Sequence, residues 1–324
     1  MPVDRLLGND RTIAYGRREI ERRLRRRSTE IDRSFIIWLD APGTYLMANA
    51  LKTPLSLAHL TVLSLAPPDM IEVAARTGYQ TVGLRLIKVT ETTPGYPLMD
   101  NKPMMRATKS AAAASGIGVL DIEFVKITPE INVASLEPFL AAGAELGARY
   151  VITSPYDPVL ARLADRLAAI SDLSSQYHLR TVLEFFPWTV VPDLAAASRI
   201  VEATRRPEVG ILVDTLHFNR SSSSLEQLDA IPAGRLPFVH ICDAMVQESY
   251  TTEELLYTGR AERLPPGEGE IDIRSILNRM PRGIPLALEV PMTAMTKAKG
   301  AETVALRVRQ AAKRLLAPDL ASLS

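Results

Sequence analysis

The sequence predicts an α/β protein of the (β/α)8 TIM barrel class, built as a single domain with an N-terminal extension. Eight short apolar segments alternate with amphipathic segments of helical length. This alternation is typical of parallel strands joined by helical crossovers, and eight such units over about 260 residues match the size of a barrel. A doubly wound open sheet is the alternative. However, the loop after the first expected strand, Ala66-Pro67-Pro68-Asp69, lacks the glycines of a phosphate-binding loop.

Each expected strand is apolar, and each expected helix carries start or stop signals. Pro67 and Pro68 are typical of a first helical turn, and Gly78, Gly116 and Gly147 stand where helices should end. We expect strands at residues 57–64, 81–87, 118–125, 149–154, 180–185, 210–214, 236–242 and 284–289. We expect helices at residues 68–77, 103–115, 134–146, 157–178, 192–205, 272–280 and 298–315.

The N-terminal stretch differs from the rest of the chain. Residues 1–46 contain no clear strand pattern, whereas the barrel is expected over residues 47–324. RNA or membrane contact is one interpretation of the arginine run in this stretch, but a solvated or disordered arm is favoured. The run consists of Arg17, Arg18, Arg22, Arg23, Arg25, Arg26 and Arg27.

Composition indicates an ordinary globular protein. Of the 324 residues, 47% are hydrophobic and 23% are charged, with a formal net charge of +1. This charge gives no sign of a polyanionic partner. Cys242 is the single cysteine, so an intrachain disulfide is impossible, which fits a reducing compartment. With no apolar run long enough for a bilayer, we expect a cytoplasmic protein with a small-molecule substrate and no nucleic-acid or membrane partner.

Ionisable residues end the last four expected strands. Glu184, Asp214, His240 and Glu289 each follow an apolar segment. The carboxyl ends of barrel strands meet at one mouth, so these side chains should converge. Any one of them could instead cap a helix, form an ion pair or lie in the core, but four buried together need a compensating cation. We therefore predict one divalent metal ion, Mn²⁺, Mg²⁺, Co²⁺ or Zn²⁺, and the many oxygen ligands favour Mn²⁺ or Mg²⁺.

Five segments around these positions resemble a known family. The segments LEFFP, VDTLH, HICDA, LPPGEGEID and LALEVP are similar to those of the xylose-isomerase-like TIM barrel superfamily, often described as sugar phosphate isomerases/epimerases. The resemblance covers roughly residues 55–315. It implies that Glu184, Asp214, His240 and Glu289 are the metal ligands, and that His217 contacts a substrate oxygen.

The resemblance also implies a reaction class. It indicates a metal-dependent isomerase or epimerase that acts on a sugar or sugar-like hydroxy-carbonyl compound through proton transfer and a metal-stabilised enediolate. Glu184 and Glu289 are the expected catalytic pair, since both can exchange protons. The alternative is a metal-dependent lyase, a dehydratase of the inosose or dehydroshikimate type. By analogy with the family we expect a homo-oligomer.

Substrate selection is less constrained by the sequence. Ketose 3-epimerases of the family carry an arginine six residues after the strand-seven histidine, where this chain has Val246. Arg85, Glu123 and Arg263 are other candidate substrate-binding residues. Arg85 could equally form an ion pair among strand ends, and Arg263 could be a solvated loop residue. If either arginine faces the pocket, an anionic substrate is favoured.

Other residues near the motifs have simpler interpretations. Endonuclease IV shares this fold, but its three zinc ions need more than the four histidines present, and His59 is expected at the start of the first strand, away from the mouth. Cys242 is expected to fill a small buried space. Asp243 could orient His240 or cap the next segment. The glycines of the 267–269 loop resemble a family segment, although ordinary turn geometry explains them equally well.

Overall fold

The computed structural model of the chain describes residues 53–317. The predicted extension at residues 1–46, with its arginine run, lies outside the described residues. Its role therefore stays a prediction.

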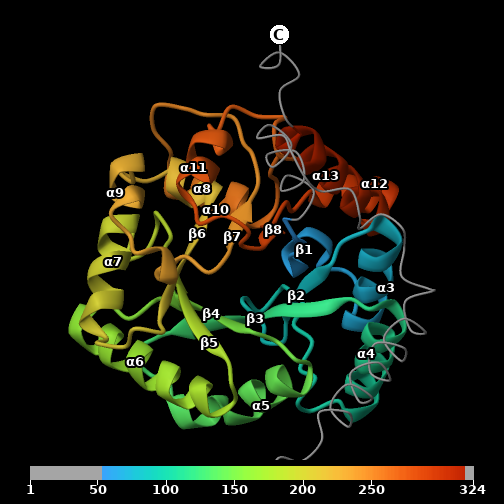
Figure 1. Cartoon of the computed structure of the whole chain (residues 1–324), viewed down its shortest axis with the longest axis horizontal. Helices are drawn as coiled ribbons and strands as arrows, with labels where there is room; N and C mark the ends of the chain where they lie inside the picture. The colour runs from blue at the N-terminus through green and yellow to red at the C-terminus, as the bar shows by residue number, and fades with distance from the viewer. Residues whose placement is uncertain (1–52, 318–324) are drawn as a thin grey trace, which may run out of the picture. The chain divides into compact units, whose positions relative to one another are not determined.

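The described residues form a closed barrel of eight parallel strands, which confirms the predicted fold class. Neighbouring strands pair in chain order, and β1 closes the ring against β8 through the Leu55–Leu286 register. Figure 1 shows the strands enclosed by a ring of helices. The strands are β1 Leu55–Leu57, β2 Thr81–Arg85, β3 Gly118–Ile127, β4 Tyr150–Pro155, β5 Arg180–Glu184, β6 Gly210–Asp214, β7 Val239–Ile241 and β8 Leu286–Leu288.

Helices cover the outside of the barrel and occupy parts of its mouth. All seven predicted helices are present with shifted ends, and α8, α9, α10 and α12 are additional. The helices are α3 Pro67–Thr77, α4 Lys102–Ser115, α5 Glu137–Glu145, α6 Leu160–Gln176, α7 Leu194–Ala203, α8 Thr215–Asn219, α9 Leu225–Asp229, α10 Thr252–Arg260, α11 Ile273–Arg279, α12 Thr293–Lys299 and α13 Ala301–Leu316. Short 3₁₀ helices occur at η2 His59–Val62, η3 Val133–Leu136 and η4 Ala233–Arg235.

The expected first strand at 57–64 was wrong. β1 ends at Leu57, and the same apolar run continues as η2, because Thr61 and His59 use their side chains to bond the neighbouring strand ends. The Thr61 hydroxyl donates to the Leu288 carbonyl at 2.8 Å, and His59 Nδ1 accepts from the Arg85 amide at 2.8 Å. His59 therefore follows the first strand at the carboxyl end, opposite to the predicted end.

A packed apolar layer fills the barrel below the strand ends. Val182, Leu212, Phe238 and Ala287 belong to one buried cluster on β5 to β8 and the residue preceding β7. Side chains two positions apart on a strand face the same side. For each of these four residues, the residue two positions further along the chain should therefore also point into the barrel, above this layer. These residues lie on β5, β6 and β7 and just beyond β8.

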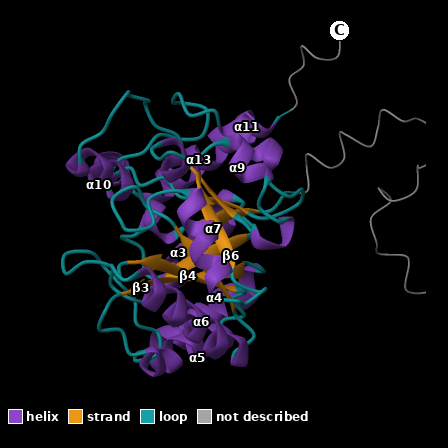
Figure 2. Ribbon diagram, turned by 90° about the vertical axis from the view of Figure 1, so that its left-hand side faces the viewer, coloured by secondary structure: helices purple, strands orange, loops and turns teal. Residues whose placement is uncertain are grey.

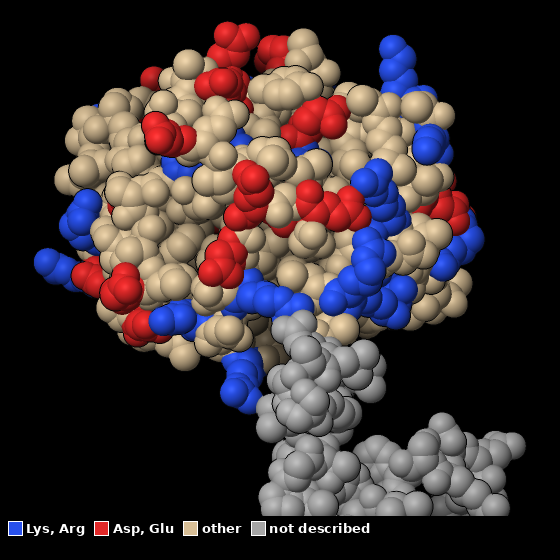
Figure 3. All heavy atoms as spheres, turned by 90° about the horizontal axis from the view of Figure 1, so that it is seen from above, with Lys and Arg blue, Asp and Glu red and all other residues tan. Residues whose placement is uncertain are grey.

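The connection from β7 to α11 is long and carries α10. Figure 2 shows α10 and the longer loops gathered toward one end of the barrel. Among residues 53–317, no helix combines the length and apolarity needed to cross a bilayer. On the face shown in Figure 3, acidic and basic side chains lie side by side, in keeping with a net charge of +1.

Candidate metal centre

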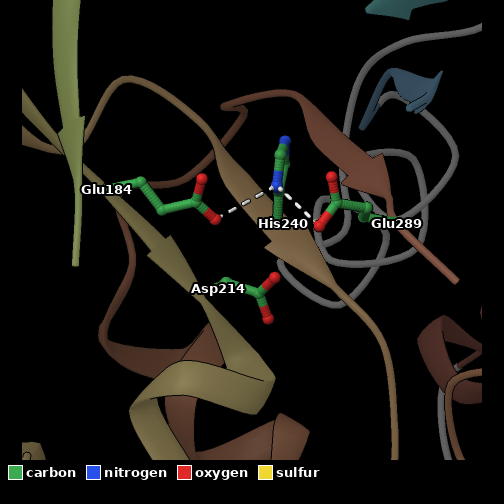
Figure 4. A group of neighbouring side chains, drawn as sticks. All are labelled: Glu184, Asp214, His240 and Glu289. Atoms are coloured by element: carbon green, nitrogen blue, oxygen red, sulfur yellow. Dashed lines mark ion pairs between the residues drawn. The ribbon is translucent and has the colours of Figure 1, made fainter. Parts of the chain in front are cut away.

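The structure brings the four predicted ligands together. Glu184 and Asp214 end β5 and β6, His240 lies in β7, and Glu289 follows β8. One ligand atom from each of the four lies within 4.8 Å of the others. All four side chains are buried, with exposed fractions of 5% or less. In Figure 4 the carboxylates of Glu184 and Glu289 approach the His240 ring from opposite sides, with Asp214 close by.

Several buried atoms of this cluster lack a hydrogen-bond partner, as expected for atoms that bind a cation. Both ring nitrogens of His240 and Oε1 of Glu184 are buried without a hydrogen-bond partner among the described residues. His240 Nδ1 lies 3.7 Å from Glu184 Oε1 and 3.6 Å from Glu289 Oε2, slightly too far for a good hydrogen bond. Buried polar atoms normally have partners. Three carboxylates and an imidazole, with unused lone pairs directed at one point, match the ligand chemistry of a divalent ion.

Arg263 is part of the wall of this centre. Its guanidinium binds Asp214 Oδ2 at 2.8 Å through Nη1 and Glu289 Oε2 at 3.0 Å through Nη2. Nη2 also donates to the Gly259 carbonyl in α10 at 2.9 Å. With 3% of its surface exposed, Arg263 is not a solvated loop residue. One positive charge offsets only part of the three carboxylates, so the need for a cation remains.

The ionisation of the ligands depends on their neighbours. Burial raises the pKa of Glu184 to about 7, despite the opposing effect of His240. Burial would also raise the pKa of Glu289, but the charges of His240 and Arg263 hold it well below its usual range. Burial opposes protonation of His240, yet Glu289 and Glu184 hold its pKa well above the ordinary value. In the absence of an ion, the cluster is thus stabilised by a proton on His240.

His217 lies beside the four ligands, on α8. Its Nε2 is 3.8 Å from Asp214 Oδ2 and 4.0 Å from Glu184 Oε1. Phe186 and Trp188 pack edge-on against its ring, with centroid distances of 4.7 and 5.1 Å. Burial lowers the pKa of His217 to about 4, so the ring is neutral near pH 7, and Nδ1 has no partner among the described residues. A neutral imidazole with a free nitrogen is suited to bond a substrate oxygen.

Arg85 and Glu123 pair with each other. Arg85 ends β2 and Glu123 lies in β3, and both side chains are buried. Arg85 Nε lies 3.1 Å from Glu123 Oε1. The neighbouring Asp121 is buried with Oδ2 unpartnered among residues 53–317, and burial, aided by the charge of Glu123, raises its pKa to about 8. These groups form a second polar layer inside the barrel, next to the metal centre.

Asp243 organises a loop, and none of its hydrogen bonds goes to His240. Its carboxylate accepts from the amides of Ala244 at 2.9 Å, Gly267 at 2.9 Å and Ile271 at 3.0 Å. A Cβ at Gly269 would lie 2.4 Å from Asp243 Oδ1, so glycine is required there by close approach. Gly267 has a φ of +81°, which glycine tolerates best. The 267–269 glycines therefore serve this loop.

The sequence analysis missed two residues of the site, Trp188 and Gly259. Trp188 and Gly259 meet over His217, and a Cβ at Gly259 would lie 2.8 Å from the Trp188 ring. The buried Cys242 lies 3.7 Å from Asp214 Oδ1, and burial raises the pKa of its thiol to about 12, in keeping with the predicted inert role. Val246 is 42% exposed, and the arginine at the metal centre comes from position 263 instead. The LPPGEGEID motif was the available signal for Arg263, which directly precedes it.

A closed parallel barrel with this cluster at its carboxyl ends defines a (β/α)8 protein with a candidate metal centre. The chain belongs to the xylose isomerase-like TIM barrel family, which it matches over residues 71–312.

Individual relatives match part of the sequence or the fold. An inosose isomerase of Bacillus subtilis (strain 168) is 27% identical over 146 residues, which is 42% of this chain and 50% of that protein. The chain thus spans about half the length of the curated relatives that it matches. The crystal structure of the IolI protein with a bound zinc atom has a TM-score of 0.67 at 19% identity and covers 81% of this chain and 98% of that one. The probable 3-DHS dehydratase AsbF of Bacillus anthracis has a TM-score of 0.63 at 12% identity, over 79% and 98% of the two chains. These structural likenesses show the shared fold.

Proposed function

We propose that this protein is a divalent-metal-dependent isomerase or epimerase of a sugar or sugar-like hydroxy-carbonyl compound. The observation that carries the proposal is the convergence of Glu184, Asp214, His240 and Glu289 within 4.8 Å at the carboxyl ends of the strands. Such sites are where barrel enzymes perform their chemistry. The inosose isomerase relative supports the reaction class and the polyhydroxylated substrate.

Glu184, Asp214, His240 and Glu289 would hold the ion. The bound zinc of the IolI structure supports a transition metal, whereas three carboxylates also suit Mn²⁺, Mg²⁺ or Co²⁺. When bound, such an ion would offset the carboxylate charge and polarise a substrate carbonyl, which makes the neighbouring C–H bond more acidic.

The protein's own residues would move the proton. Glu184 and Glu289 lie on opposite sides of His240 (Figure 4), so a substrate between them meets one carboxylate on each face. One carboxylate would remove the proton from carbon, and the other would return a proton to the same or the adjacent atom. His217, neutral and with Nε2 facing Asp214 and Glu184, would hydrogen-bond a substrate oxygen. Phe186 and Trp188, packed against it, would exclude water.

Three further side chains are proposed to contribute to substrate binding, either at the edge of the site or through other residues. They belong to Arg85, Glu123 and Arg263. Arg85 and Glu123 are tied to each other at 3.1 Å, so a substrate hydroxyl would meet them as a donor–acceptor pair. Arg263 already bonds the carboxylates of Asp214 and Glu289 and two backbone carbonyls, which leaves only Nε unpartnered among the described residues.

Dehydration is the second candidate. Removal of the same proton followed by loss of a β-hydroxyl would make the protein a lyase. The likeness to the fold of a probable 3-DHS dehydratase is the reason to consider this reaction. His217, which lies beside Asp214 and Glu184, would then be placed to interact with the leaving hydroxyl. The inosose isomerase relative makes isomerisation the favoured reaction.

The test combines metal content with the fate of the substrate proton. We expect about one equivalent of divalent ion per chain, and solvent deuterium should enter candidate inososes and ketoses in D2O, followed by NMR. Glu289→Gln should reduce the exchange rate by about 10²–10⁴-fold. The matched control is Glu130→Gln, which alters an exposed carboxylate after β3.

Three results would separate the alternatives. Deuterium incorporation without loss of water supports isomerisation or epimerisation. A new ultraviolet absorbance from a conjugated enone supports the lyase. Less than about a tenth of an equivalent of metal, together with unchanged exchange in Glu289→Gln, would overturn the proposed function.

A further inference from the structure

A cavity of about 290 Å³ adjoins the metal centre. It lies between one face of α10 and the segment that follows β7, and Arg263 forms part of its wall. The other polar lining groups include Arg220, Gln247, Tyr250 and Thr258. Its size is close to the lower end of small-ligand pockets, about 300 Å³. It can therefore hold one small molecule or one end of a larger one.

Arg220 is fixed in place on this wall. Its guanidinium stacks over the Tyr250 ring, 4.1 Å from the centroid. Nη1 donates to the Thr258 hydroxyl at 2.8 Å, and Nη2 to the Met245 carbonyl at 3.4 Å. None of these partners is charged. Glu254 acts on Arg220 through its charge but is not one of the hydrogen-bond partners of its guanidinium among residues 53–317. A rigid, partly buried guanidinium with no carboxylate in direct contact favours an anionic ligand.

The unsatisfied atoms of the two arginines are both donors. Nε of Arg220 and Nε of Arg263 are buried and have no hydrogen-bond partner among the described residues. Arg263 is 3% exposed, so leaving its donor unsatisfied is costly. The Nη atoms of Arg220 donate to the Thr258 hydroxyl and, at 3.4 Å, to the Met245 carbonyl, which leaves further N–H donors for the acceptor oxygens of a carboxylate or a phosphate.

Acidic groups on the same wall are already engaged. Glu254 Oε2 accepts from the amide and the hydroxyl of Thr251, both at 2.8 Å. Glu262 Oε1 accepts from the Ala294 amide at 2.8 Å. Arg263 is balanced by Asp214 and Glu289. Arg220 therefore remains the guanidinium of this cavity without a carboxylate partner in the described chain.

Two connections join the cavity to the metal centre. Arg220 is the C-cap of α8, three residues after His217, so one helical turn separates the two side chains. Arg263 contacts the ligands with its Nη atoms and lines the cavity as well. The cavity and the metal centre thus share Arg263 as a common wall.

We propose that the cavity beside α10 is the subsite for a carboxylate or phosphate group of the substrate, with Arg220 as its charged partner. This inference rests on the proposed function for the identity of the ligand as substrate. The anion site itself does not depend on it, because Arg220 is held by the protein alone.

Direct binding tests the subsite without turnover. Inorganic phosphate and acetate are titrated separately into the full chain by calorimetry, at constant ionic strength. We expect saturable binding of at least one anion, weakened about tenfold or more by Arg220→Gln, because a charged hydrogen bond is lost. Arg220→Lys should retain part of the affinity, since the charge remains but the planar stack on Tyr250 is lost. The matched control is Arg199→Gln, which removes one positive charge from the exposed side of α7.

The outcomes are distinct. The anion that binds more tightly identifies the group as carboxylate or phosphate. No saturable binding of either anion, or equal affinity in Arg220→Gln and Arg199→Gln, overturns the proposal. Circular dichroism checks that Arg220→Gln is folded, and if it is not, Arg220→Lys decides. Loss of metal binding or of deuterium exchange would overturn the proposed function instead and would leave the anion titration unaffected.

Discussion

Asp121 has a buried carboxyl group that keeps its proton to a higher pH in the folded protein than in the unfolded chain. Burial, followed by the charge of Glu123, raises its pKa from 3.8 to about 8. In the unfolded chain the group ionises at its ordinary pKa. As pH rises from about 4 to about 8, the unfolded state therefore loses this proton while the folded state keeps it. The group's contribution to the free energy of unfolding falls across that window and is constant above it.

Asp121→Asn should remove this pH dependence. We expect the variant to gain stability relative to the unsubstituted chain as pH rises from about 4 to about 8, measured by urea unfolding with a chelator present. The chelator matters because a bound cation would favour the ionised form. Asp165→Asn, which changes an exposed carboxyl on α6, is the matched control. Parallel stability curves for Asp121→Asn and the unsubstituted chain would contradict the prediction.

Single residues also show how much of the site could be predicted from the sequence. Glu184, Asp214 and Glu289 were predictable because a carboxylate at the end of an apolar strand is rare, and barrel geometry places strand ends together. His59 was misplaced because the apolar run after Leu57 fits a strand or a buried helical turn equally well. The role of Arg263 as a bridge between two ligands depends on a loop conformation that no local pattern encodes.

At the level of elements, α10 is the least predictable of those that contact the site. Gly259 on α10 meets Trp188 over His217, and its carbonyl accepts from Arg263. The strand and helix pattern of the barrel was predictable from period and capping residues. The placement of α10 was not, since it depends on tertiary contacts with the β5 and β6 loops.

Gly259→Ala should disturb this contact. The new Cβ would lie 2.8 Å from the Trp188 ring, so the ring or the helix must move. Overpacking costs about 1–3 kcal/mol, against a gain of about 1 kcal/mol from replacing a helical glycine with alanine. We expect a lower free energy of unfolding and a slower reaction, because Trp188 supports His217.

The control for this change is Gly234→Ala. A Cβ at Gly234 meets no atom within 4 Å, and its φ is not positive. Stability should stay the same or rise slightly there. If Gly259→Ala were as stable and as active as Gly234→Ala, the close packing of α10 on Trp188 would not constrain the site.

Across the whole molecule, the candidate metal centre joins four of the eight strands. Glu184 and Asp214 end β5 and β6, His240 lies in β7 and Glu289 follows β8, so an ion would tie together half of the barrel. Without an ion, these buried carboxylates are offset within residues 53–317 by Arg263, which pairs with Asp214 and Glu289, and by His240, whose pKa they hold above its ordinary value. Metal binding should therefore be coupled to global stability.

Metal removal should lower the unfolding midpoint. At a free ion concentration about 100 times the Kd, binding adds about 2.7 kcal/mol, which corresponds to roughly 5–10 °C for a domain of this size. Scanning calorimetry with and without a chelator measures the shift, and added ion should restore it in a concentration-dependent manner. Glu289→Gln should respond less than Glu130→Gln. Identical midpoints in the presence and absence of ion would show that the four side chains do not bind one.

The burial of the four ligands has a kinetic consequence. With exposed fractions of 5% or less, the four residues offer little access from solution. We expect the departure of a bound ion to require movement of α10 and its flanking loops. We expect the rate of ion loss to become independent of chelator concentration and to rise in Gly259→Ala, where the packing on Trp188 is loosened. How long the protein retains its ion would thus be set by the motion of a surface helix as well as by the strength of the metal bonds.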